Sequence, residues 1–291
     1  MRFVYSGILS VALTLLFIGL GGKIQSIKRL SDLNAEKMHS QVPTVFIKKQ
    51  GDKYVLYRHG KPYFIKGAGG YSNLEVLAEH GGNSLRTWDT QNAQEILDRA
   101  HDLGLTVTLG LEVGSQWWRD DIDYTNPKEV DKKIEEIKNI VLKYKNHPAL
   151  LMWGVGNEVH LFQGNDTGLW VTINRIAKMI HQVDPNHPTM TALSIKTFRE
   201  KHEMIKFKLI CTNIDVLAVN PFGEIETVFA DIYNSTFGMK TWDGPFLISE
   251  WGTDGPWETP RTSWRVPIEP NSTEMAEKII RYYQNTIQKD S

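Results

Sequence analysis

The chain has little or none of several features that would point to particular classes of protein. Its 291 residues include one cysteine, Cys211, so an internal disulfide framework is excluded. The net charge is −1, which provides no basic field for nucleic acid and no solvating acidic tail. Glycine-rich phosphate loops, HExxH motifs and paired histidines do not occur. The sequence therefore predicts no metal site, no cofactor and no nucleic-acid partner.

One long uncharged run is present, at the N-terminus. Residues 3–22 lie between Arg2 and Lys23 and carry no charge, which is typical of a secretory signal or of an uncleaved membrane anchor. Both alternatives stay open for residues 1–22, and either predicts a protein that is secreted or attached to a membrane, outside the cytoplasm. Residues 23–41 are polar and are expected to form a linker, and residues 42–291 the folded domain.

The folded domain begins with strand-like alternation around Gly51-Asp52 and Gly60-Lys61, which are hairpin signals. This N-terminal β-hairpin is expected either to close the bottom of a barrel or to be the remnant of a preceding β domain. Strand-like and helix-like stretches then alternate, and the strands are predicted at residues 63–70, 83–88, 105–113, 150–159, 189–194, 214–223 and 245–252.

Each predicted strand is followed by a helical pattern, so the chain reads as seven consecutive β-then-α units. Such units favour a parallel sheet covered by helices, and right-handed crossovers of this number tend to close into a (β/α)8 TIM-type barrel. The fold class is therefore α/β. No eighth strand is found, so the barrel is predicted to lack it and to leave two sheet edges open.

Polar residues recur at the ends of these otherwise apolar strands. In an α/β barrel the residues that act stand at the C-terminal ends of the strands. The residues found there are Arg86, Glu112, Asn157, Glu158, Asn220 and Glu250. Glu158 and Glu250 end the fourth and seventh strands, which lie nearly opposite one another. Two carboxyl groups facing each other are what glycoside hydrolysis requires, about 5–5.5 Å apart in retaining enzymes.

Three motifs carry a family resemblance: GNE at Gly156–Glu158, ISEWG at Ile248–Gly252 and NSLRTW at Asn83–Trp88. Over residues 45–287 the chain resembles the TIM-barrel catalytic domain of glycoside hydrolase family 2, within the clan of retaining β-glycosidases. The resemblance implies that Glu158 is the acid/base and Glu250 the nucleophile. It also implies that Asn157 contacts the sugar 2-hydroxyl and that Arg86 supports the nucleophile.

Further substrate-binding residues are expected around this pair. Asn220 comes from the end of the sixth strand, His160 follows Glu158, and the indoles of Trp118 and Trp251 are suited to stacking on sugar rings. The chain also departs from the family pattern. Members usually have β-sandwich domains before the barrel, and a tyrosine near the nucleophile is replaced here by Phe222, which has no hydroxyl.

The predicted function is retaining hydrolysis, or transglycosylation, of β-glycosidic bonds in oligo- or polysaccharides. One alternative is a non-catalytic or vestigial carbohydrate-binding barrel, in which the two glutamates are ordinary ion-paired residues. A different barrel enzyme with a glutamate base, such as an isomerase or lyase, would need a metal cluster or phosphate loop that the sequence lacks.

Overall fold

The computed structural model describes residues 43–114, 122–159, 167–233, 235–236, 239–240 and 242–290. The elements described below belong to one compact unit, which begins at Thr44. The predicted signal or anchor, the linker, and the candidate residues Trp118 and His160 lie outside the described residues. Within the described ranges, no helix is both long enough and apolar enough to cross a membrane.

The main sheet has seven strands, which lie side by side in the order of the sequence. Every neighbouring pair is parallel. The strands are β4 (Gly67–Gly69), β5 (Ser84–Arg86), β6 (Thr106–Leu111), β7 (Leu150–Asn157), β8 (Thr189–Ser194), β9 (Val216–Asn220) and β12 (Phe246–Ile248). The predicted parallel sheet of successive β-then-α units is therefore confirmed.

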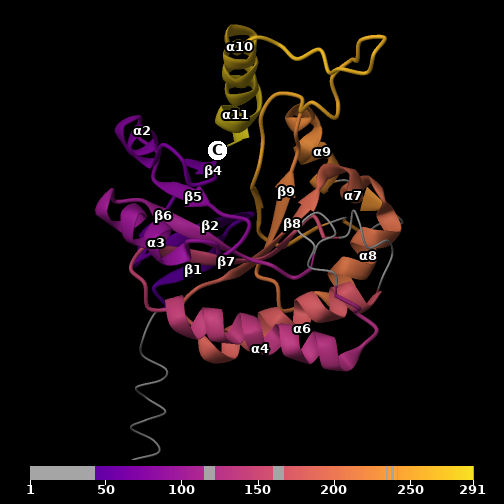
Figure 1. Cartoon of the computed structure of the whole chain (residues 1–291). Helices are drawn as coiled ribbons and strands as arrows, with labels where there is room; N and C mark the ends of the chain where they lie inside the picture. The colour runs from indigo at the N-terminus through magenta and orange to yellow at the C-terminus, as the bar shows by residue number, and fades with distance from the viewer. Residues whose placement is uncertain are drawn as a thin grey trace, which may run out of the picture. The chain divides into compact units, whose positions relative to one another are not determined.

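Helices surround this sheet, as Figure 1 shows, and α10 lies between α9 and α2 in that arrangement. The helices are α2 (Leu74–Glu79), α3 (Ala93–Asp102), α4 (Pro127–Tyr144), α6 (Thr167–Val183), α7 (Ile195–Arg199), α8 (Lys201–Ile210), α9 (Val228–Tyr233), α10 (Ser272–Tyr282) and α11 (Gln288–Asp290). Short turns of other helix types occur at Ile225–Thr227 and Tyr283–Ile287. The order of helices and strands is that of an incomplete (β/α) barrel.

The two ends of the sheet remain edges in the part of the chain that the structure describes. β4 and β12 do not pair with each other there, and no eighth strand joins them. β4 is shorter than the predicted residues 63–70, because the backbone N–H of Tyr63 bonds instead to Leu56 O in the N-terminal sheet. The predicted gap between the first and seventh strands is therefore present among the described residues.

The N-terminal residues form a three-stranded antiparallel sheet of β1 (Val45–Gln50), β2 (Lys53–Arg58) and β3 (Lys61–Pro62). Val45 N donates to Asn186 O, and Arg58 Nη2 donates to Pro148 O, 2.9 Å away. Both acceptors precede strands of the main sheet, so the small sheet covers the N-terminal ends of those strands.

Local sequence explains the helix boundaries. α4 begins at Pro127, and the side chain of Asn126 caps it by accepting the backbone N–H of Lys128 at 3.1 Å. The helix predicted at residues 227–238, after the sixth strand, is shorter than expected. It ends at Tyr233, because Ser235–Thr236 pairs with Met239–Lys240 as a small antiparallel ladder, β10 with β11.

Candidate active site

Six polar side chains meet at the C-terminal ends of the main-sheet strands. Five of them are strand-end residues that the sequence singles out, and the sixth is a tryptophan. They are Arg86 and Trp88 at the end of β5, Asn157 and Glu158 at the end of β7, Asn220 at the end of β9, and Glu250 after β12. Chain segments more than 160 residues apart are thereby brought into direct contact.

The amide of Asn220 joins the two glutamates. Its Nδ2 lies 3.0 Å from Glu158 Oε1 and 3.1 Å from Glu250 Oε1. Those two distances place the two Oε1 atoms at most about 6 Å apart, so the glutamates form one close pair. Ser249 fixes the amide orientation, because its hydroxyl lies 2.6 Å from Asn220 Oδ1.

Arg86 binds one partner with each terminal nitrogen. Nη1 donates to Glu250 Oε1 at 2.6 Å, and Nη2 donates to Asn157 Oδ1 at 2.8 Å. The guanidinium is nearly buried, with 8% of its side chain exposed, and burial lowers its pKa while Glu250 opposes that effect. An arginine nonetheless stays charged in proteins. Arg86 thus holds a positive charge against Glu250 and turns the amide nitrogen of Asn157 away from itself.

A distortion of β7 lets two consecutive residues face the same site. Neighbouring side chains in a regular strand point to opposite faces, yet Asn157 and Glu158 both contact Asn220. The register with β8 shifts between Gly154 and Asn157, and Glu158 takes a left-handed φ of 50°. Gly156, with a φ of 75°, permits the turn, since a Cβ there would lie 2.8 Å from Val159 Cγ2.

The electrostatics separate the two glutamates. Burial raises the pKa of Glu158 above its ordinary value, and the negative charge of Glu250 raises it further. The hydrogen bond from Asn220 and the charges of Arg86 and Lys196 oppose that rise without cancelling it. Glu250 has the direct ion pair with Arg86. Glu158 therefore holds a proton more tightly than an ordinary glutamate does, while Glu250 lies against a positive charge.

Trp88 is part of this site although the pattern of strand-end polar residues does not predict it. Its indole Nε1 donates to Glu250 Oε1 at 2.7 Å. The residue lies two positions beyond Arg86 in the motif NSLRTW, so the only sequence signal is an aromatic donor just after a strand-end arginine.

The other predicted residues have different surroundings. Trp251 is half-buried and packs against the main hydrophobic core. Glu112 is exposed directly after β6. Phe222 packs edge-to-face on Trp257, with ring centroids 5.6 Å apart. No group of three or more histidine, cysteine or carboxylate side chains among the described residues is placed to hold a metal ion.

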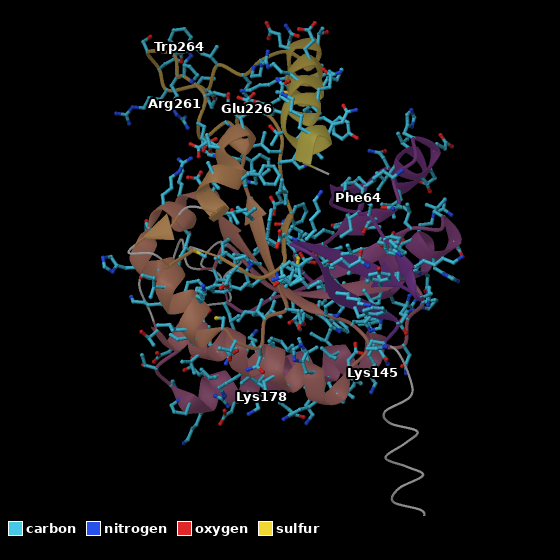
Figure 2. The ribbon with its side chains drawn as sticks, turned by 180° about the vertical axis from the view of Figure 1, so that it is seen from behind. Phe64, Lys145, Lys178, Glu226, Arg261 and Trp264 are labelled. Carbon is cyan, nitrogen blue, oxygen red and sulfur yellow. The ribbon has the colours of Figure 1, made fainter. Side chains whose placement is uncertain are left out.

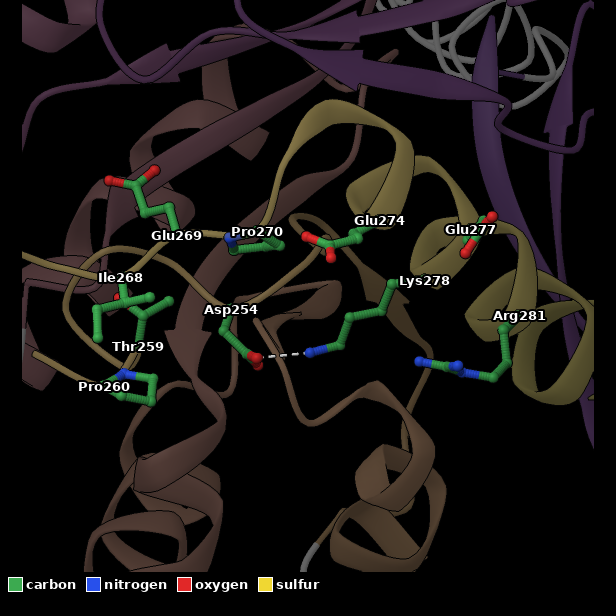
Figure 3. Close-up of a pocket in the computed structure, with 10 residues that line it drawn as sticks. All are labelled: Asp254, Thr259, Pro260, Ile268, Glu269, Pro270, Glu274, Glu277, Lys278 and Arg281. Carbon is green, nitrogen blue, oxygen red and sulfur yellow. Dashed lines mark hydrogen bonds and ion pairs between the residues drawn. The ribbon is translucent and has the colours of Figure 1, made fainter.

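A cavity of about 480 Å³ lies elsewhere, between the loop after β12 and helix α10 (Figure 3). Asp254, Thr259, Glu269 and Lys278 are among its lining residues, and Lys278 pairs with Asp254 across 2.5 Å. None of the six clustered side chains lines this cavity. The clustered carboxylates, and not the cavity, define the candidate site.

A parallel sheet surrounded by helices, with polar groups gathered at its C-terminal edge, is the arrangement of a TIM-type barrel. Residues 71–257 match the family described as Glycosyl hydrolases family 2, TIM barrel domain. The chain belongs to this family.

Curated relatives support the same family assignment. The chain is 21% identical over 245 residues to a β-glucuronidase of Paenibacillus borealis, a match that covers 76% of this chain and 40% of the relative. It is 33% identical over 115 residues to a β-galactosidase of Thermoanaerobacter pseudethanolicus, covering 38% of this chain and 13% of that one. The chain therefore spans less than half the length of these curated relatives.

Solved structures show the same fold. A galacturonate-bound family 2 β-galacturonidase from Eisenbergiella tayi aligns with a TM-score of 0.57 and 20% identity, covering 83% of this chain and 44% of that chain. A β-D-glucuronidase of Dictyoglomus thermophilum aligns with a TM-score of 0.56 and 19% identity, again over 83% and 44%. At this identity the likeness establishes the fold.

Proposed function

We propose that this domain cleaves β-glycosidic bonds with retention of configuration, through a covalent glycosyl-enzyme formed on Glu250. The observation that carries the proposal is the contact of one amide nitrogen, Asn220 Nδ2, with both carboxylates. The shared donor keeps the two Oε1 atoms within about 6 Å of each other, which supports the short carboxyl separation of a retaining pair over the ~6.5–9.5 Å of an inverting one.

In the first step, Glu158 donates its proton to the glycosidic oxygen while a carboxylate oxygen of Glu250 attacks the anomeric carbon. The bond from that carbon to the leaving oxygen breaks, and its electron pair goes to the protonated leaving group. The raised pKa of Glu158 supports the acid role, and the ion pair of Glu250 with Arg86 supports the nucleophile role.

In the second step, Glu158 acts as a base. It takes a proton from a water, or from a sugar hydroxyl in transglycosylation, and the resulting oxygen nucleophile displaces Glu250 from the anomeric carbon. Asn157 supports this chemistry as a contact for the sugar 2-hydroxyl. Its Oδ1 is held by Arg86, and its Nδ2 has no acceptor among the described residues, so the amide N–H groups are available to a substrate oxygen.

The relatives suggest which substrates to try first. A panel of p-nitrophenyl β-D-glucuronide, β-D-galactoside and β-D-galacturonide is expected to contain a substrate, and proton NMR should detect the β-anomer as the first product. Glu250→Gln should lower turnover by about 10⁴-fold or more and prevent labelling by the matching 2-fluoro glycoside. Glu112→Gln, a strand-end carboxylate outside the cluster, is the control. Full activity of Glu250→Gln would overturn the assignment.

A second candidate function is carbohydrate binding without cleavage. The open sheet between β4 and β12 favours it, because a complete barrel has no such gap. Calorimetry with oligosaccharides, run beside the hydrolysis assay, distinguishes the two functions. Binding without product formation would support the binding protein and contradict the hydrolase.

We also propose that the uncharged residues 3–22 direct the protein out of the cytoplasm, as a cleaved signal or a retained anchor. Fractionation of cells expressing the full chain, followed by N-terminal sequencing, tests this. A soluble cytoplasmic protein that begins at Met1 would contradict it.

A further inference from the structure

The hydrogen bonds to Glu250 are concentrated on one of its two oxygens. Oε1 accepts from Arg86 Nη1 at 2.6 Å, from Trp88 Nε1 at 2.7 Å and from Asn220 Nδ2 at 3.1 Å. Oε2 accepts no hydrogen bond from the residues that the structure describes. An ionised carboxylate has about four acceptor sites shared between two oxygens. The local donors therefore crowd one oxygen and leave the other to an external atom.

Trp88 differs from the other two donors in how many partners it has. Arg86 also binds Asn157, and Asn220 also binds Glu158, so a change at either residue disturbs several groups at once. The indole N–H of Trp88 has Glu250 as its hydrogen-bond partner. A change confined to that N–H therefore reports on Glu250.

The strands on both sides of β5 make room for Trp88. A Cβ on Gly110, in β6, would lie 2.4 Å from the carbonyl carbon of Trp88, so only glycine lets the backbone cross there. The backbone N–H of Gly110 donates to Thr87 Oγ1 at 3.0 Å and fixes that crossing. On the other side, a Cβ on Gly69, in β4, would stand 3.2 Å from Trp88 Cζ2. β6 thus fixes the backbone at Trp88, and β4 leaves space beside its indole.

We infer that Trp88 is a positioning residue for Glu250, and that its N–H helps hold Oε1 so that Oε2 is the oxygen that bonds to the anomeric carbon. This inference rests on the proposed retaining function. When the Oε2–carbon bond forms and the leaving-group bond breaks, Oε1 becomes the carbonyl oxygen of the glycosyl ester and keeps its three donors. When water releases the sugar, the electron pair returns to the carboxylate with its orientation unchanged.

The test replaces Trp88 and measures attack by Glu250 alone. The probes are 2,4-dinitrophenyl 2-deoxy-2-fluoro glycosides of β-D-glucuronic acid, β-D-galactose and β-D-galacturonic acid. Dinitrophenolate departs without protonation, so the labelling rate does not depend on Glu158. Trp88→Phe keeps an aromatic ring and removes the N–H. Labelling should become about 10–100-fold slower, because a carboxylate that has lost one orienting contact reaches the reactive geometry less often. The concentration for half-maximal labelling should change little.

The matched control is Trp264→Phe. Trp264 is 73% exposed and projects from the loop before α10 (Figure 2), so the same exchange there should leave labelling at the wild-type rate. Incorporating benzothienylalanine at position 88 provides a second variant that keeps the shape of the indole and replaces only its N–H with sulfur. Labelling of this variant should be slowed as much as labelling of Trp88→Phe.

The outcomes separate the two claims. A wild-type protein that none of the three probes labels, and that hydrolyses none of the chromogenic glycosides, contradicts the proposed function itself. A wild-type protein that is labelled on Glu250, together with a benzothienylalanine variant labelled equally fast, overturns the inference, because ring shape alone would then position Glu250. Labelling that is slow in both variants and normal in Trp264→Phe supports it.

Discussion

At each end of the main sheet, a carboxylate accepts a hydrogen bond from an indole N–H. At the C-terminal end, Trp88 donates to Glu250 at 2.7 Å. At the N-terminal end, Trp153 of β7 donates at 2.8 Å to Asp184, in the loop before β8. The same strand contributes to both clusters, since β7 also ends in Asn157.

The two clusters differ in how fully the carboxylate is bonded. Asp184 uses both oxygens: Oδ1 accepts the backbone N–H of Asn186 at 3.0 Å, and Oδ2 contacts Trp153 and His187 Nδ1. Its side chain is 1% exposed, against 14% for Glu250. A carboxylate with partners on both oxygens stabilises the fold, whereas one bonded on a single oxygen keeps an oxygen for chemistry. That difference can be tested by matched substitutions.

The largest difference is expected when each carboxylate becomes an amide. Asp184→Asn places an NH2 group against N–H donors whichever way it turns, so it should lower the free energy of unfolding by about 3 kcal/mol. Glu250→Gln can keep its carbonyl oxygen at Oε1, where the hydrogen bonds persist, and its NH2 at the unbonded position, but it loses the charge that pairs with Arg86. Its unfolding free energy should fall by about 1–2 kcal/mol, less than that of Asp184→Asn. Urea denaturation of both variants measures this, and equal losses would contradict the comparison.

A smaller difference is expected for the two tryptophans. Trp153 is fully buried, so Trp153→Phe removes a hydrogen bond and leaves a cavity, at about 2 kcal/mol of unfolding free energy. Trp88 is half-buried and Glu250 Oε1 keeps two other donors, so Trp88→Phe should cost about 1 kcal/mol or less while slowing the labelling reaction. Thermal unfolding measures the two stability losses, and the labelling rate per folded molecule is measured in parallel. A larger stability loss in Trp88→Phe than in Trp153→Phe would contradict the prediction.

Acidification should remove the stabilisation that the charge of Asp184 gives to the fold. Burial raises its pKa, but hydrogen bonds from His187, Trp153 and the backbone of Asn186 outweigh that effect, and the net pKa lies below the ordinary value. The stabilisation from its charge is therefore present above the unfolded-state pKa and is lost as pH falls through the lower folded-state value. The stability gap between wild type and Asp184→Asn should narrow over that interval. A stability difference between wild type and Asp184→Asn that widens on acidification would contradict this prediction.

The smallest effect concerns Glu158, whose pKa is raised by burial first and by the charge of Glu250 in addition. In Glu250→Gln that charge is absent, so the pKa of Glu158 should move down towards its ordinary value while burial still holds it up. Carbon-13 NMR of labelled glutamate measures the change. Glu258→Gln is the control, because Glu258 is not among the groups that shift Glu158. An unchanged or higher pKa in Glu250→Gln would contradict the electrostatic account.

The sequence predicted the strand-end residues because parallel strands share one edge. Arg86, Asn157, Glu158, Asn220 and Glu250 each follow an apolar run, and the structure brings all five together. Strand order along the chain was enough for this, since neighbouring units in the sequence are neighbours in the sheet.

Features that depend on several strands at once were not predictable. The placement of Trp88 depends on Gly110, which leaves space for its backbone, and on Gly69, which leaves space for its indole, on the two strands that flank β5. Strand periodicity assigns Asn157 and Glu158 to opposite faces, and only the register shift and left-handed backbone reverse that assignment. The bond from Trp153 to Asp184 likewise joins a strand to a loop 31 residues later, which no local pattern indicates.

The two open edges of the sheet bear on how the molecule behaves at high concentration. β4 and β12 are three residues each, so each edge offers a foreign strand only a short stretch of backbone for pairing. Very short edge strands are one of the devices by which natural sheets resist fusing with one another. Among the described residues, these short edges therefore leave little backbone for association through strand pairing.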